Sequence, residues 1–314
     1  MSLRNPLSSL KISRGRLQEH VVAGDETFED ARKEMQGDLK RTHEHVKAIP
    51  LSSLTRKQAA RYDIICETLT LRTDAGYAST ERVYFKPWSL LKLQQHPIDH
   101  SDRETGCDDD SDEDDTGAFL CNVLVYEFMQ YARDGQPPGN TLEYLSGWYG
   151  GSFDRKILKS RYMDLAMFSD PHRNPLASPP LSFDAVWYRY LPQELPHISL
   201  IVSYGGVGND NLLRSEVLAL VGIMRTRLGQ TELREHTIAP VLMISCIGFL
   251  KARIIQAYYT NGRLMMLKSP LHDFSTPEAR GINIPLFLLY MCSDCIGDTK
   301  ALSREIPLNE DTNP

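Results

Sequence analysis

The sequence predicts an α+β fold: a helical N-terminal region, a disordered acidic loop, and a C-terminal core of helix, three strands and helix. Three observations support this prediction. Apolar residues make up 41% of the 314 residues, enough for a full core. Apolar runs of strand length recur after residue 198. Nine carboxylates between residues 102 and 115 interrupt the apolar pattern.

Four segments follow from this pattern. Residues 1–95 are the helical N-terminal region, 96–117 the acidic disordered loop, 118–300 the α+β core domain and 301–314 a tail. Nine carboxylates against Arg103 give the loop a local charge of −8, so the rest of the chain carries +2 of the net −6. Such self-repelling charge with few apolar residues favours disorder.

Two helices and a short strand are expected in the N-terminal region. The first helix runs from Asp25 to Val46. The second begins at Thr55, because Thr55-Arg56-Lys57-Gln58 has the spacing of a capping box. Apolar positions 59, 62, 65, 66 and 69 then recur at helical spacing, so we expect this helix to continue. Residues 83–85 form the short strand.

The C-terminal part has the most regular pattern. A helix is expected at 119–131, and Asn261-Gly262 predicts a type I′ hairpin because both residues tolerate positive φ. Pro285 falls in the first turn of a final helix, where it is tolerated. We expect Leu242, Ile244, Ile254 and Ile255 to be buried. The remaining elements are strands at 198–204, 241–247, 252–259 and 264–268, and helices at 212–228 and 284–295.

Composition also limits the compartment and the partners. No apolar run approaches the about 18 to 20 residues of a membrane span, and the N-terminus has no apolar signal core. Six cysteines scattered over a long chain fit reduced thiols. We therefore expect a cytoplasmic protein without a membrane partner, whose oligomeric state the sequence leaves open.

Two short motifs suggest ligands but lack the full pattern. Gly205–Gly208 separates a strand from a helix, where backbone N–H groups can hold a phosphate. The dinucleotide pattern needs a third glycine where Asn211 stands, so we expect a tight turn with residue 209 or 210 capping the helix. Cys292-Ser293-Asp294-Cys295 has metal spacing, but a structural zinc needs four ligands. We expect neither a metal nor a cofactor.

The order helix–strand–strand–strand–helix over residues 212–295 resembles the core of the PD-(D/E)XK nucleases. In that family a carboxylate on one strand and Glu/Asp-x-Lys on the next hold a metal beside the scissile phosphate. Here Lys268 has Met266 two residues before it in place of an acid, and Glu216 is the one accessory acid. The resemblance therefore implies a degenerate domain that binds nucleic acid. Basic and aromatic residues that offer an RNA-binding face, or merely a solvated surface, are 155–161, Arg225, Arg227, Lys251, Arg253, Tyr162, Tyr188 and Tyr190.

The acidic loop contains the motif D-D-x-x-E, as Asp109-Asp110-Ser111-Asp112-Glu113. This motif, and the texture of the C-terminal half, resemble the fungal arginine-containing cyclodipeptide synthases. The resemblance implies a transferase of fungal secondary metabolism that joins two aminoacyl groups, with arginyl-tRNA and a second aminoacyl-tRNA as partners. It implies Asp109, Asp110 and Glu113 as catalytic residues, and paired carboxylates suit a guanidinium. The alternative is a solvated linker in a non-catalytic interaction protein.

Overall fold

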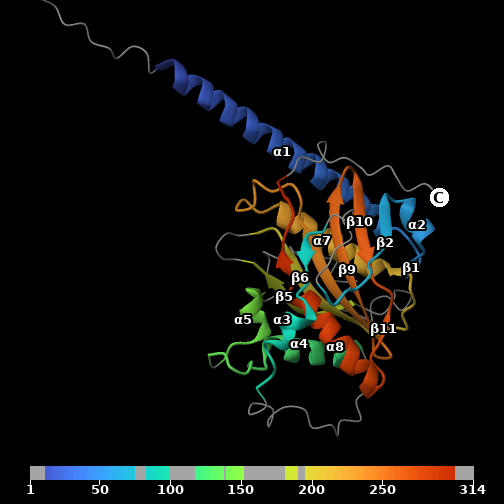
Figure 1. Cartoon of the computed structure of the whole chain (residues 1–314). Coiled ribbons are helices and arrows are strands. Elements are labelled where there is room, and N and C mark those ends of the chain that lie inside the picture. The colour runs from blue at the N-terminus through green and yellow to red at the C-terminus, as the bar shows by residue number, and fades with distance from the viewer. Residues whose placement is uncertain are drawn as a thin grey trace, which may run out of the picture.

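The computed structural model describes residues 11–74, 83–99, 117–137, 139–151, 181–189 and 195–300, with the backbone alone for 11–27, 151, 182 and 183. The predicted acidic loop, apart from its ends, and the tail lie outside the described residues. Within them the chain is a mixed α/β structure with seven helices and a large mixed sheet (Figure 1). None of the described helices has the length and apolar character needed to cross a membrane.

The large sheet has eight strands in the order β2-β10-β9-β8-β6-β5-β4, with β11 paired to β9. Strands β2, β10, β8 and β6 run in the same direction, because β2–β10 and β8–β6 are parallel while β9 is antiparallel to both β10 and β8. Their carboxyl ends therefore meet at one edge, here named the carboxyl edge. The strands are β2 (Ile64–Thr68), β4 (Tyr149–Gly151), β5 (Leu181–Tyr188), β6 (Ile198–Tyr204), β8 (Val241–Ile247), β9 (Lys251–Thr260), β10 (Arg263–Lys268) and β11 (His272–Asp273).

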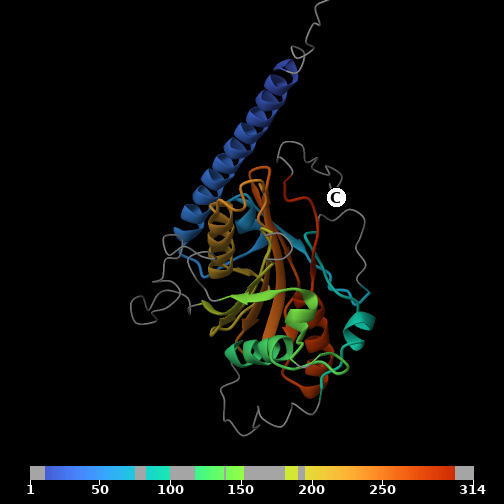
Figure 2. The same ribbon diagram turned by 90° about the vertical axis from the view of Figure 1, so that its left-hand side faces the viewer.

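Helices cover both faces of this sheet (Figure 2). One face, the α7 face, packs against α1 and α7; the other, the α4 face, packs against α3, α4 and α8, with α5 beside α4. Two short strand pairs, β1–β7 and β3–β12, lie outside the large sheet. The helices are α1 (Lys11–Lys47), α2 (Arg56–Ala60), α3 (Leu90–Gln94), α4 (Gly117–Met129), α5 (Leu142–Ser146), α7 (Arg214–Leu228) and α8 (Pro277–Met291). The short strands are β1 (Ser53–Leu54), β3 (Phe85–Lys86), β7 (Leu212–Leu213) and β12 (Asp294–Cys295).

Helix α1 is tied to the end of α7 by polar contacts. The buried Arg32 guanidinium donates to the carbonyls of Leu228, Gln230 and Leu233, and Gln36 Nε2 donates to the Leu228 carbonyl at 2.7 Å. A cation at a helix C-terminus satisfies carbonyls that have no partner within the helix. The N-terminal region also supplies β2 to the large sheet, so regions 1–95 and 118–300 share one sheet.

Several predicted elements are confirmed. Strands β6 and β8 have the predicted bounds, and β9 and β10 pair antiparallel around Asn261-Gly262, whose φ values are 50° and 73°. The predicted strands β8, β9 and β10 are adjacent, but they are the middle of a larger sheet. The side chains of Leu242, Ile244, Ile254 and Ile255 are all 0% exposed, as expected.

The helix predicted from Thr55 is much shorter than its apolar spacing suggested. The capping box is present: Thr55 N donates to Gln58 Oε1 at 2.9 Å, and Gln58 N donates to Thr55 Oγ1 at 3.3 Å. The helix ends at Ala60, however, and Asp63 adopts a φ of 56°. Residues 64–68 then form β2, because parallel pairing with β10 offers partners to the backbone groups on the inner side of this edge strand. The predicted helical continuation was wrong.

The bounds of other predicted elements also shift. The final helix begins at Pro277, with Thr276 as its N-cap, and ends at Met291, so Pro285 lies inside it rather than in its first turn. The cysteine at 295 belongs to β12. Helix α1 begins earlier than predicted, at Lys11, and β3 lies one to two residues later than the predicted strand at 83–85.

Candidate functional site

The Arg253–Glu216 ion pair, the pocket at Lys268 and the carboxyl group of Asp184 all lie near the carboxyl edge. Strands β6, β8, β10 and β2 end there at Tyr204, Ile247, Lys268 and Thr68. Ligands of open α/β sheets commonly bind outside the carboxyl ends of parallel strands. Side chains near this edge form one group on the α7 face and another on the α4 face.

On the α7 face, Arg253 of β9 and Glu216 of α7 form a fully buried ion pair. Arg253 Nε donates to Glu216 Oε1 at 2.9 Å, and its Nη2 donates to Oε2 at 2.6 Å, with both side chains 0% exposed. Arg253 Nη1 also donates to the Asn209 carbonyl at 3.1 Å, and Leu213 N donates to Glu216 Oε2 at 2.8 Å. Both Glu216 oxygens are thus occupied, so this acid is structural here and caps the start of α7. The prediction that residue 209 or 210 caps this helix was wrong.

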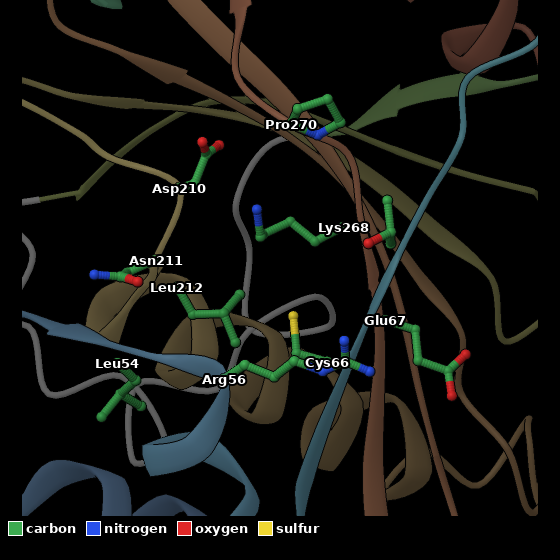
Figure 3. A pocket seen from close by; sticks show the side chains of 10 residues that line it. Leu54, Arg56, Cys66, Glu67, Asp210, Asn211, Leu212, Lys268 and Pro270 are labelled. Carbon is green, nitrogen blue, oxygen red and sulfur yellow. The ribbon is translucent and has the colours of Figure 1, made fainter. Parts of the chain in front are cut away.

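A pocket of about 320 Å³ opens beside this ion pair, between β2, the end of β10 and the segment that leads into β7 (Figure 3). The Lys268 side chain reaches toward the segment carrying Asp210 and Leu212, while Glu67 points away from it (Figure 3). The pocket is lined by Leu54, Arg56, Cys66, Glu67, Thr68, Asp210, Asn211, Leu212, Lys268 and Pro270. Its lining therefore combines two cations, two carboxylates, a thiol and apolar side chains.

Burial and neighbouring charge change the acid–base properties of two groups in this pocket. Burial, and then the positive charge of Arg253, lower the pKa of Lys268, although Cys66 and Asp210 act in the opposite direction. Burial raises the pKa of the Cys66 thiol despite the nearby Lys268 and Arg56. Cys66 is therefore a protonated thiol near neutral pH, and a weak nucleophile in this environment.

On the α4 face, Asp184 of β5 lies next to Ser203 of β6 and Cys121 of α4, and Cys121 in turn lies next to Cys246 of β8. Partial burial raises the pKa of the Asp184 carboxyl, while hydrogen bonds from Ser203 and Cys121 favour its ionised form. Burial, and then a hydrogen bond with Cys246, raise the pKa of Cys121 well above its usual value. Gly117, the first residue of α4, packs so closely that a Cβ would lie 2.8 Å from the Cys246 carbonyl oxygen. The glycine thus lets the start of α4 reach this cluster.

An aromatic side chain is presented to solvent between these two groups. Phe249 follows β8 and is 63% exposed, with a φ of 63°; the next residue, Leu250, has a φ of 50°. Two successive non-glycine residues at positive φ are uncommon and cost free energy. The Gly248 N–H donates to the Tyr204 carbonyl at 3.0 Å, and the Phe274 N–H donates to the Leu250 carbonyl at 2.8 Å, so hydrogen bonds hold the turn.

The other predicted motifs take structural roles. Gly208 lies against β8, where a Cβ would be 2.4 Å from Ile247 Cγ2, and α7 starts only at Arg214, so the glycine loop is a connecting segment packed on β8 and does not form the start of the helix. Cys292 is fully buried, and burial raises the pKa of Cys295 to about 12. The part of the chain that the structure describes holds no group of three His, Cys, Asp or Glu residues placed to bind a metal ion.

The predicted site residues Asp109, Asp110 and Glu113 lie outside the described residues, as do 155–161, Tyr162 and Tyr190. Two members of the proposed RNA-binding face are internal: Arg253 pairs with Glu216, and Arg227 donates to the Leu195 carbonyl at 2.6 Å. Both are nearly fully buried, so they add no positive charge to the surface.

Sequence reasoning missed Asp184, Cys66 and Arg56 as candidate site residues. Asp184 lies inside the mostly apolar run Leu181–Tyr188. A carboxylate is unusual within such a strand, and this could have marked the residue as a candidate. Cys66 and Arg56 gave no comparable signal, because only the pairing of β2 with β10 brings them near Lys268. Comparison of the chain with protein families, curated proteins and solved structures yields no match.

Proposed function

We propose that this chain binds single-stranded nucleic acid at the carboxyl edge and does not cut it. The observation that carries the proposal is Phe249, exposed in a hydrogen-bonded turn at that edge. Aromatic side chains on such platforms stack on unpaired bases, and adjacent cations follow the backbone phosphates. Lys251 is exposed two residues later, at the start of β9, and the Lys268 pocket opens on the same edge.

The order of the elements supports a nucleic acid as the partner. Strands β8, β9 and β10 lie between α7 and α8 in the chain, with the short β11 after them, and β5 and β6 are another pair of adjacent strands earlier in the chain. Strand β5 carries the carboxylate of Asp184, and the nuclease resemblance requires a carboxylate on one strand. The likeness to the nucleases lies in the order of the elements and in the position of a carboxylate. A shared order of elements does not by itself establish a function. Phe249 is what supplies a surface for the ligand.

The same comparison argues against cleavage. Strand β6 follows β5 and reads Ile198–Tyr204, with neither a carboxylate nor a lysine for the acidic-x-Lys pattern. Asp184 instead has the hydroxyl of Ser203 and the thiol of Cys121 beside it, and its pKa is raised. Magnesium prefers several oxygen ligands, of which carboxylates contribute most of the charge. A lone carboxyl group with a raised pKa is a poor start for such a site.

Fluorescence anisotropy with a labelled single-stranded oligonucleotide tests the proposal. Phe249→Ala should weaken binding about 5- to 100-fold, since stacking on one base contributes ~1 to 3 kcal/mol. Leu91→Ala, a similarly exposed apolar position on α3, is the matched control and should leave the affinity unchanged. The oligonucleotide should stay intact in Mg²⁺. Equal affinities for the two variants, or no binding at low salt, would refute the proposal.

A second candidate function is the aminoacyl-tRNA-dependent synthesis of an arginine-containing cyclic dipeptide. The observation that favours it is the D-D-x-x-E motif, whose Glu113 precedes Gly117 by four residues in the sequence. Gly117 starts α4 against Cys246, in the cluster around Asp184. Here arginyl-tRNA and a second aminoacyl-tRNA are the partners, and the ester of a charged tRNA supplies the activation.

Mass spectrometry of extracts from cells that express the chain alone tests this candidate. Asp109→Asn, Asp110→Asn and Glu113→Gln should each remove most of a cyclic dipeptide product, because losing a charge-assisted pair costs ~2 to 5 kcal/mol. The neighbouring Asp114→Asn and Asp115→Asn should have little effect. No product, or equal small losses at all five positions, would leave the acidic segment as a linker of a binding protein.

A further inference from the structure

We infer that the pocket beside Lys268 binds a small organic anion, a carboxylate or phosphate ester with a short apolar body. The inference goes beyond the proposed function, since it concerns a cavity on the α7 face rather than a surface that stacks bases. A pocket of about 320 Å³ is at the small end of the range for ligand sites.

Two cations give the pocket its preference for an anion. Among the described residues, Lys268 Nζ donates a 3.3 Å hydrogen bond to the carbonyl of the adjacent Ser269. Arg56 forms no ion pair with any described residue. Both side chains line the same cavity (Figure 3). Both place positive charge on the lining, and each can hold an oxygen of a carboxylate or phosphate group, for which an arginine fork and a lysine point charge are both suited.

The neighbouring acids do not cancel this charge. Glu216 is engaged on both oxygens by Arg253, so the buried pair beneath the pocket is close to neutral. Glu67 points away from Lys268 (Figure 3). Asp210 remains, and its Oδ1 already accepts from the Leu271 N–H at 3.2 Å. Two cations and one carboxylate are therefore directed into the pocket, and this balance favours a negatively charged ligand.

The other residues that line the pocket predict that the ligand is apolar beyond its anionic group. Leu54 and Leu212 are 1% exposed, and together with Pro270 they form an apolar wall within reach of the cations. Burying an apolar group there contributes roughly 25 cal/mol per Å². An anion with an apolar body should therefore bind more tightly than inorganic phosphate. Thr68 adds a hydroxyl that can donate to the same anionic group.

Isothermal titration of the full chain tests the inference with three probes at matched ionic strength. They are inorganic phosphate, N-acetyl-L-leucine, and the neutral N-acetyl-L-leucinamide (leucinamide below), which has the same apolar body without the anion. We expect the first two to bind and leucinamide to remain silent. The relative affinity of phosphate and N-acetyl-L-leucine separates a phosphate ligand from a carboxylate ligand. Binding of leucinamide as tight as that of N-acetyl-L-leucine, or no binding by either anion, would overturn the inference.

Variants locate the binding in this pocket. Lys268→Met and Arg56→Gln should each raise the dissociation constant at least about tenfold, the usual effect of losing one charge-assisted hydrogen bond. Arg263→Gln, at the opposite end of β10 and exposed, is the matched control and should leave it unchanged. Arg56 is exposed, so its variant keeps the test valid even where Lys268→Met lowers stability. Unchanged affinity in Arg56→Gln and Lys268→Met would contradict this location.

Discussion

The two faces of the sheet at the carboxyl edge accommodate their ionisable side chains in different ways. On the α7 face, a full positive charge and a full negative charge are buried together, each with several hydrogen bonds. On the α4 face, a single, partly exposed carboxyl group lies beside a hydroxyl and a thiol, and its pKa is raised. One face therefore buries two opposite charges as a pair, whereas the other leaves its acid partly in solvent without an opposite charge from any described residue beside it.

This difference indicates which single substitutions each face can accept without a large loss of stability. A buried charge is tolerated only while its partner remains, because desolvation of an unpaired ion costs several kcal/mol. A carboxyl group that is half in solvent can lose its proton or be replaced by an amide with less consequence. The α7 face should therefore be sensitive to single substitutions that the α4 face tolerates.

The largest expected effect is on the ion pair. Arg253→Met leaves Glu216 buried without its counter-charge, so the free energy of unfolding should fall by ~3 to 5 kcal/mol. Urea denaturation measures it. The double variant Arg253→Met/Glu216→Met should recover much of this loss, since no unpaired charge remains, although the Leu213 N–H loses its acceptor. Arg263→Met, on the exposed start of β10, serves as the control. A loss below 1 kcal/mol in Arg253→Met would mean that the pair is not the sensitive point of this face.

The next effect compares apolar packing on the two faces. Ile255 of β9 faces α7 and Ile244 of β8 faces α4, and both are 0% exposed. Replacing either with Ala should lower the free energy of unfolding by ~2 to 5 kcal/mol, from lost burial and the cavity left behind. Chemical denaturation of the two variants in parallel gives the comparison. A loss under 1 kcal/mol at one position alone would show that this face is less well packed than its burial indicates.

The smallest effect is a pH dependence on the α4 face. The pKa of Asp184 is raised in the folded protein, so the folded state holds its proton to a higher pH than the unfolded state does. Between these two pKa values the folded state binds more protons, and its stability falls as the pH rises. Asp184→Asn removes this term. The stability of the parent chain relative to the variant should therefore decrease from pH 3 toward pH 7, measured as denaturation midpoints. Parallel curves for the two proteins would contradict a raised pKa.

Local patterns were enough for the elements that the sequence predicted correctly. Strand β8 is a nearly continuous apolar run, and the Asn261-Gly262 dipeptide predicts the hairpin between β9 and β10 from two residues that accept positive φ. The capping box at Thr55 is likewise a contact between residues three apart. Each depends on neighbours in the chain, and such signals survive without knowledge of the remaining structure. The disorder of the acidic loop, which lies outside the described residues, stays a prediction.

Only the tertiary structure decided which strands and side chains that are far apart in the sequence pair with one another. Residues 64–68 are strand rather than helix because β10, some 200 residues later, offers backbone partners, and no local pattern carries that information. The same pairing assembles the pocket around Lys268, and packing of α7 against β9 turns a suspected metal acid, Glu216, into the partner of a buried arginine. Sequence alone established a mixed α/β chain and its strong hairpin. The environment of each polar side chain came from the packing, because burial and the identity of a charge's nearest partner depend on segments far away along the chain.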